Sequence, residues 1–221
     1  GHVYYPYEPL LDECREILQV ERDIIVNALA GIALEKKIVI EDLNENPDAY
    51  KENNKAVFLS KFHVCETNIS FRIKRLVSSP KTIRSVDAEK AVTWVQEKLD
   101  ISLAEKQAQA VHSAITHKML VITGGPGTGK TTIIHAILEI FSRMGIRILL
   151  AAPTGRAAKR MQEATGHEAK TIHRLLAYSF ADNGFKHNDK NPLDGDLLIV
   201  DEASMIDTVL MHHLLKSVPV G

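Results

Sequence analysis

The stretch Leu120–Thr132 reads LVITGGPGTGKTT and sets the expectations for the rest of the chain. Its apolar start, Leu120–Ile122, predicts a buried strand, and an apolar-periodic helix is predicted from Lys130 onward. Between the two, Gly124–Thr131 fits the pattern G-x-x-x-x-G-K-[ST]. A glycine-rich turn that joins a strand to a helix, with lysine at this offset, is typical of a phosphate-binding loop.

The loop contains the residue types that a nucleoside triphosphate needs. Glycines let successive backbone N–H groups point at a polyphosphate, and the following helix adds the positive end of its dipole. We expect Lys130 to reach the β- and γ-phosphates and the Thr131 hydroxyl to complete a Mg²⁺ shell. The residues predicted to bind ATP here are Gly124, Gly125, Pro126, Gly127, Thr128, Gly129, Lys130, Thr131 and Thr132. A dinucleotide-binding turn is disfavoured because the G-x-G-x-x-G spacing is absent.

Composition is that of an ordinary globular protein, with 221 residues, 25% charged residues and a net charge of −1. Charge is uneven along the chain: residues 55–84 carry seven basic side chains against one acidic, and residues 143–174 carry seven against two. Each basic zone either meets a polyanion or forms a solvated face. Cys14 and Cys65 predict reduced thiols, and we expect a cytoplasmic protein with no zinc site and no membrane span.

Residues 1–79 predict a small, mainly helical module behind an extended lead-in. The expected elements are helices over 10–18, 21–36 and 62–77 and short strands over 38–40 and 56–59. Helices with a two-stranded wing resemble a winged-helix or helix-turn-helix module. The module either touches DNA through its basic third helix or serves as a scaffold. A scaffold is favoured because no Asn, Arg and Gln cluster is placed to read base edges.

The second half of the chain predicts an α/β domain after a linker. Residues 80–101 form the predicted linker helix, with apolar periodicity over 86–99. Ser102–Glu105 then fits a capping box that predicts the start of a further apolar-periodic helix. Two continuous apolar runs, Ile146–Ala152 and Leu197–Val200, predict strands of a parallel sheet covered on both faces. The domain predicted over residues 102–221 is therefore a P-loop fold with a parallel sheet.

An acidic pair, Asp201 and Glu202, follows the second of these strands. Open α/β sheets bind ligands at the carboxyl ends of their strands. We expect Asp201 to hold Mg²⁺ and Glu202 to polarise the water that attacks the γ-phosphate. Lys130 and Glu202 are thus the predicted catalytic residues.

Four stretches together resemble the superfamily 1 DNA helicases of the RecD/TraA type, which move 5′→3′ on single-stranded DNA. They are GGPGTGKTT at 124–132, APTGRAAKRM at 152–161, TIHRLL at 171–176 and LLIVDEASMID at 197–207. The similarity covers residues 102–221 and extends loosely to the N-terminal module of stand-alone RecD-like proteins. It implies a RecA-like motor domain with ATP and Mg²⁺ as cofactors and single-stranded DNA as partner.

The resemblance also assigns individual roles. Gln107 lies where these helicases keep a glutamine that reads the adenine edge, with Gln109 as the alternative. The residues implied for contact with the strand are Pro153, Thr154, Arg156, Lys159, Arg160, Thr171 and His173. For His173, a histidine that is satisfied within the core is the alternative.

The later motifs of the family have no counterpart in the 221 residues. The resemblance therefore implies a longer chain, whose second RecA-like domain supplies the arginine finger. In RecA-like sheets one further strand lies between the phosphate-loop strand and the acidic-motif strand, so we expect the sheet here to be incomplete. We expect the protein to be a monomer.

Two other functions remain open at this point. A P-loop ATPase that acts on protein, such as a transposition or repair helper, would share the phosphate loop and the Asp201–Glu202 pair but would not need the 152–161 and 171–176 motifs. A non-catalytic DNA-binding module would tolerate a degenerate nucleotide site. The intact Lys130 and Glu202 argue against degeneracy.

Overall fold

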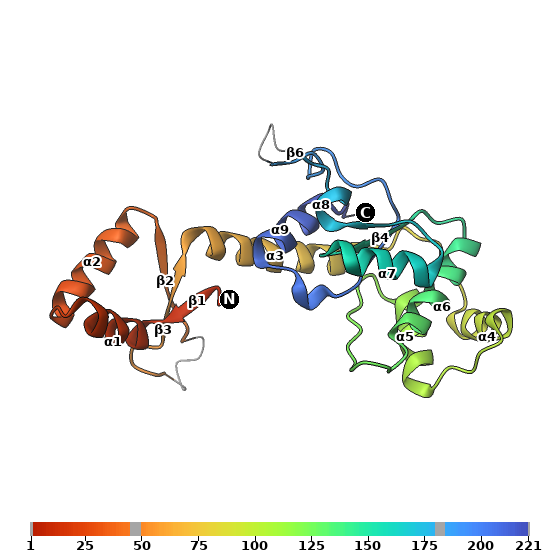
Figure 1. Cartoon of the computed structure of the whole chain (residues 1–221), viewed down its shortest axis with the longest axis horizontal. Helices are drawn as coiled ribbons and strands as arrows, with labels where there is room; N and C mark the ends of the chain where they lie inside the picture. Colours follow the sequence, from red (N-terminus) through yellow and green to blue (C-terminus); the bar gives the residue numbers. More distant parts are fainter. Residues whose placement is uncertain (1, 45–49, 180–183, 221) are drawn as a thin grey trace. The chain divides into compact units, whose positions relative to one another are not determined.

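The computed structural model describes residues 2–44, 50–179 and 184–220. The chain divides into two compact units, Gly1–Ser70 and Phe71–Gly221, which we call unit 1 and unit 2. Figure 1 shows the elements of each. The domain borders drawn from the sequence, after residues 79 and 101, stay a prediction.

Unit 1 combines a small antiparallel sheet with helices. Its strands are β1 (Tyr4–Pro6), β2 (Ile38–Asp42) and β3 (Lys55–Leu59), in the order β1-β3-β2. Its helices are α1 (Tyr7–Leu18), α2 (Arg22–Leu34) and the first part of α3 (Ser60–Ser78). Strand β1 was not predicted from the sequence. The aromatic lead-in pairs with β3 and gives a sheet of three strands instead of the predicted two-stranded wing. The module is mixed α and β.

Three helices of unit 2 pack together around the residues that flank the phosphate loop. They are α4 (Ala88–Leu99), α5 (Glu105–Thr116) and α6 (Lys130–Arg143). Val95, Val111 and Ala136 are fully buried in the core that they share. Apolar periodicity predicted all three helices, and burying their stripes against one another is what stabilises them.

Helix α5 begins differently from the prediction. Its N-cap is Ala104, two residues after the expected Ser102. Leu103 is buried, and its N–H donates to Oε1 of Gln96 in α4 at 2.8 Å. This hydrogen bond ties the segment before α5 to α4. The Ala104 N–H is capped instead by Gln107 Oε1 at 3.0 Å, so a residue predicted to read adenine also closes the helix.

The parallel sheet of unit 2 has three strands in the order β5-β4-β8. They are β4 (Ile148–Ala152), β5 (Ala169–Thr171) and β8 (Leu197–Val200). Alternate residues of β4 face opposite sides: Leu150 packs with Leu138 of α6 and Met161 of α7 (Gly155–Thr165). Ala151 packs with the cluster around α8 (Ile172–Leu175) and α9 (Thr208–Ser217). The expected covering of both faces is therefore confirmed.

The predicted strand before the phosphate loop is wrong for this structure. Residues 117–125 carry no strand, and Val121 is 73% exposed, whereas Ile122 packs against the α4–α6 core. A strand needs a neighbour for its backbone groups, and β8, at the end of the sheet order, pairs only with β4 among the described residues. A small parallel sheet that lacks the phosphate-loop strand is consistent with a partial P-loop domain.

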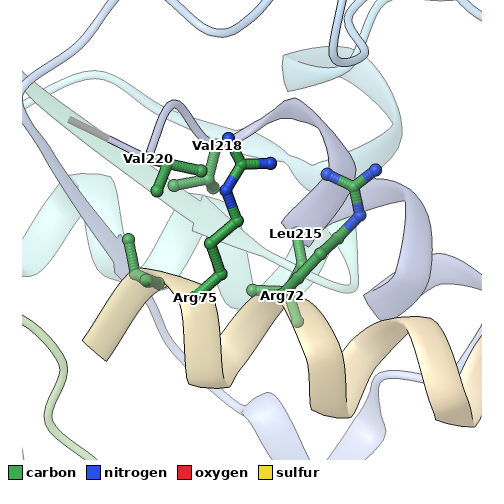
Figure 2. A pocket seen from close by; sticks show the side chains of 6 residues that line it. Arg72, Arg75, Leu215, Val218 and Val220 are labelled. Atoms are coloured by element: carbon green, nitrogen blue, oxygen red, sulfur yellow. The ribbon is translucent and has the colours of Figure 1, made fainter. Parts of the chain in front are cut away.

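Helix α9 and the C-terminal part of α3, both in unit 2, enclose a small cavity. Figure 2 shows Arg72 and Arg75 projecting from α3 toward Leu215, Val218 and Val220. No residue predicted to bind nucleotide or DNA lines it. A short hairpin of β6 (Tyr178–Ser179) and β7 (Gly184–Phe185) follows α8. Within the described ranges, no helix is long and apolar enough to cross a membrane.

Candidate nucleotide and nucleic-acid site

The phosphate loop adopts a backbone that depends on glycine. Gly127 and Gly129 lie in the left-handed region, with φ of 76° and 80°. A Cβ on Gly129 would stand 2.2 Å from Gln107 Nε2, and one on Gly124 would stand 2.6 Å from Thr128 Oγ1. The backbone therefore requires glycine for its conformation at Gly127 and Gly129, whereas a Cβ at Gly124 or Gly129 would displace the end of the Thr128 or Gln107 side chain.

Lys130, the first residue of α6, folds back over the loop. Its Nζ donates to the carbonyls of Gly124 at 2.6 Å and Gly125 at 2.8 Å. Residues 123–128 are exposed. A phosphate oxygen is a stronger acceptor for an ammonium than a neutral carbonyl, because it carries negative charge and adds direct attraction between opposite charges. The loop, the lysine and the N-terminus of α6 thus fit a polyphosphate.

Gln107 connects the start of α5 to the phosphate loop. Besides accepting from the Ala104 N–H, its amide donates from Nε2 to the Thr128 carbonyl at 3.1 Å. Both ends of the amide therefore have partners inside the protein. To read an adenine edge, Gln107 would share or exchange these two hydrogen bonds.

The acidic pair stands at the end of β8. The Asp201 N–H donates to the Ala151 carbonyl at 3.0 Å, which continues the pairing with β4. Glu202 has a left-handed backbone, with φ of 51°, and its N–H donates to Asp201 Oδ1 at 2.9 Å. The turn holds both carboxylates at the edge where parallel strands bind ligands.

The donor set fits Mg²⁺ better than a transition metal. Asp201 and Thr131 offer hard oxygen ligands, which Mg²⁺ prefers, together with water and phosphate oxygens. Among the described residues no group of three His, Cys, Asp or Glu side chains is placed to hold a metal ion. A bound Mg²⁺ would thus depend on the nucleotide for part of its shell.

Residues predicted to contact DNA lie at the same edge of the sheet. Pro153 and Thr154 follow β4, Thr171 ends β5 and Asp201 follows β8, so all four stand at the carboxyl ends of three neighbouring strands. Thr154 Oγ1 accepts from the Ala157 N–H at 3.2 Å and caps α7. Thr171 caps α8 in the same way. Both threonines thus have a structural use besides the predicted contact.

Three basic side chains of α7, Arg156, Lys159 and Arg160, are exposed. Lys159 Nζ lies 3.7 Å from a carboxylate oxygen of Glu163, one turn further along the helix. Arg160 Nη2 donates to Glu202 Oε1 at 3.2 Å. The structure therefore joins a predicted DNA contact to the predicted catalytic carboxylate. No signal in the sequence indicated this pair, because the partners lie 42 residues apart.

His173 is exposed and belongs to an aromatic group. Its ring centroid lies 6.2 Å from that of Tyr178 and 5.8 Å from that of Phe185. Phe185 in turn lies 4.9 Å from the ring of His213 on α9. The alternative for His173, a core histidine with its hydrogen bonds made inside the protein, is therefore wrong because the residue is exposed.

Comparison with known proteins identifies the family of the chain. Residues 107–221, just over half of the chain, match the family described as "AAA domain". The chain is 36% identical over 199 residues to the ATP-dependent RecD2 DNA helicase of Deinococcus radiodurans. The aligned region covers 87% of this chain and 27% of that protein. It is 38% identical over 138 residues to the RecBCD enzyme subunit RecD of Mycolicibacterium smegmatis, covering 52% of this chain and 25% of that protein.

A third relative extends the similarity over nearly the whole chain. The RecBCD enzyme subunit RecD of Buchnera aphidicola is 28% identical over 250 residues, covering 98% of this chain and 40% of that protein. The chain belongs to the AAA domain family, and within it to the RecD-like proteins of superfamily 1. It spans about a quarter of the length of the first two relatives.

Proposed function

We propose that this chain is the ATP-binding part of a DNA helicase motor that moves 5′→3′ along single-stranded DNA. The carrying observation is the pairing of Arg160 with Glu202, which joins an exposed basic helix to the acidic pair of the nucleotide site. The relative named as a DNA helicase and the relative named as a RecD subunit support the same function. The polarity rests on the family resemblance alone.

In this function the phosphate loop binds the triphosphate and the acidic pair acts on the attacking water and the metal ion. Loop N–H groups and the Lys130 ammonium bind the β- and γ-phosphates and stabilise charge that develops on them. Glu202 orients the attacking water and accepts its proton. Mg²⁺, held by Thr131 and Asp201, would neutralise charge on the phosphates when bound.

The exposed basic residues of α7 would neutralise phosphates of the strand. Arg156, Lys159 and Arg160 contact the backbone in this proposal, so their contribution is independent of base sequence and falls as salt rises. His173, with Tyr178 and Phe185 beside it, offers ring faces to a base. Such contacts suit a motor that must move along any sequence.

Hydrolysis by residues 1–221 alone is expected to be slow. The family resemblance implies an arginine finger from a second RecA-like domain, and such a finger is worth ~10³–10⁵ in rate. We therefore expect this chain to bind ATP weakly and to show neither rapid turnover nor unwinding. Robust DNA-stimulated turnover by this chain would contradict the proposal that a second domain completes the site.

The deciding experiment is ATP hydrolysis by the full-length gene product, with and without single-stranded DNA. We expect stimulation by DNA, and loss of hydrolysis in Lys130→Ala and Glu202→Gln while DNA binding persists. Hydrolysis without stimulation would favour an ATPase that acts on protein. No hydrolysis at all would favour a non-catalytic module. Unwinding of duplexes with a 5′ or a 3′ tail then tests the polarity.

A further inference from the structure

The contact between Arg160 and Glu202 is a single hydrogen bond between two accessible side chains. The Nη2–Oε1 distance is 3.2 Å, and the side chains are 63% and 40% exposed. Strong charge-assisted bonds of arginine are shorter, at about 2.7–2.9 Å, and are often bidentate. Exposed ion pairs contribute only about 0.2–1 kcal/mol. A better anion can therefore take Arg160 from Glu202.

The two residues are needed for different tasks at the same time. Nη2 of Arg160 can join a bidentate contact with a DNA phosphate only when it leaves Glu202. In the same way, Oε1 of Glu202 can turn toward water at the γ-phosphate only when it leaves Arg160. The backbone of Glu202 is fixed by its left-handed turn and by the bond from its N–H to Asp201. The side chain is thus the part that exchanges partners.

We propose, resting on the helicase function above, that Arg160 is a positioning residue that couples the strand to hydrolysis. Without DNA it pairs with Glu202 and holds the carboxylate away from the attacking water. When a strand binds, a backbone phosphate takes the guanidinium with a bidentate contact and Glu202 is released. DNA stimulation of hydrolysis then follows in part from this exchange, and coupling of this kind is reciprocal for binding.

Reciprocity gives a test that does not depend on turnover. We would measure binding of a fluorescein-labelled oligothymidylate to the full-length gene product, without nucleotide, by fluorescence anisotropy at one fixed salt concentration. Glu202→Gln removes the competitor for Arg160, so we expect tighter binding by about 1.4- to fivefold, the range that an exposed pair allows. Arg160→Gln is expected to weaken binding.

The double variant separates exchange from simple repulsion. In the Arg160→Gln background, Glu202→Gln is expected to leave DNA affinity unchanged. If Glu202→Gln tightens binding equally in both backgrounds, the effect is general charge repulsion and the proposal is wrong. No effect in either background contradicts it as well. Failure of the unmodified protein to bind DNA would instead overturn the proposed function.

A matched pair elsewhere in unit 2 provides the control. Arg147 contacts Asp194, and the Arg147 side chain is 62% exposed, close to the value for Arg160. Asp194→Asn removes an exposed carboxylate from an arginine without touching the predicted site. We expect no change in DNA affinity. Tightening equal to that of Glu202→Gln would contradict the specific exchange.

Hydrolysis provides a second readout that a merely structural role would not change. Arg160→Gln is expected to raise the rate of hydrolysis without DNA by up to about fivefold. This is the largest factor by which an exposed ion pair can reduce the fraction of molecules with an unpaired Glu202. The stimulation of this variant by saturating DNA falls correspondingly. Arg160→Lys, which keeps the charge, is expected to restore part of the low DNA-free rate. An unchanged DNA-free rate in Arg160→Gln contradicts the proposal.

Discussion

The phosphate loop and the region from β7 to α9 are held by different kinds of contact. In the loop region, residues 104–130, side chains donate to nearby carbonyls: Lys130 to Gly124 and Gly125, and Gln107 to Thr128. In the β7–α9 region, residues 184–217, opposite charges pair across long stretches of chain. The sequence separations are 42 for Arg160–Glu202, 47 for Arg147–Asp194 and 117 for Arg72–Asp189.

This difference has consequences for function. Contacts of the loop region depend on backbone conformation and on neutral acceptors, so they change little with pH or salt. Contacts of the β7–α9 region are exposed or half-buried ion pairs, which salt screens and other anions displace. A nucleotide site needs the first property to keep its shape. A sensor for a polyanion needs the second.

Lys130→Ala is the change with the largest expected effect on the loop region. Charged hydrogen bonds contribute about 1.5–3 kcal/mol, so we expect nucleotide affinity to fall about ten- to a hundredfold. Thermal stability should hold, because the partners of Lys130 are exposed loop carbonyls that water can satisfy. Titration with a fluorescent ATP analogue measures the affinity.

Lys106→Ala is the charge-matched control for this change. Lys106 is an exposed residue of α5 beside Gln107. We expect its loss to alter nucleotide affinity by less than about twofold. Equal losses in the two variants would show that only net charge matters, and the assigned role of Lys130 would then be wrong.

Gly129→Ala tests whether backbone conformation controls the loop. Alanine at φ of 80° is strained, and its Cβ would stand 2.2 Å from Gln107 Nε2. We expect unfolding free energy to fall by about 1–3 kcal/mol from strain alone. Gly125 has no atom within 4 Å of an added Cβ, so Gly125→Ala should keep the thermal stability. Chemical denaturation of both variants makes the comparison, and equal stabilities would show that the left-handed backbone at residue 129 does not require glycine.

Gln107→Ala separates the two roles of the amide. Loss of the cap on Ala104 should lower unfolding free energy by about 1 kcal/mol. If Gln107 also reads adenine, the preference for ATP over GTP should fall in the same variant. Gln109→Ala, which changes an exposed residue of the same helix, is expected to do neither. Destabilisation with an unchanged preference would leave Gln107 with its structural role alone.

The motif predicted the glycine-dependent turn and the helix that follows it, because it encodes contacts between residues that are close in sequence. Lys130 Nζ reaches the Gly124 carbonyl six residues back, and the spacing of the motif indicates that contact. The hydrogen bond from Gln107 to the Thr128 carbonyl spans 21 residues and lies outside the motif. The strand before the loop was expected but is not formed, because pairing depends on another strand and not on apolar residues at 120–122. Local pattern does not report whether a partner is present.

The β7–α9 region was much harder to predict. Asp201 and Glu202 could be placed at the end of a strand, but their partners could not be identified. Arg72 lies in a basic zone that either meets a polyanion or forms a solvated face, whereas its guanidinium donates to Asp189 Oδ2 at 2.8 Å. Such pairs depend on which helices pack together, and the sequence does not encode that in any short window. Counting basic residues along the sequence therefore overstates the basic surface that is available to a polyanion.

His212→Gln has the smallest expected effect and tests the pH sensitivity of the β7–α9 region. Burial lowers the pKa of His212 on α9 below its usual 6.5, and His213 and Lys216 lower it further. The folded protein thus favours neutral His212, whereas the unfolded chain takes up a proton near 6.5. The contribution of His212 to the free energy of unfolding is fully present above about pH 6.5. It is lost as the pH falls from there toward the lower pKa of the folded state.

We therefore expect unmodified protein to lose more unfolding free energy than His212→Gln between about pH 7.5 and about pH 5.5. Chemical denaturation at several pH values measures the difference. His117→Gln, an exposed residue after α5, controls for the loss of one imidazole. Equal losses in unmodified protein and His212→Gln would show that α9 does not carry the pH sensitivity. A larger loss in the unmodified protein would place the pH sensitivity in the β7–α9 region, apart from the phosphate loop, where Lys130 donates to neutral carbonyls.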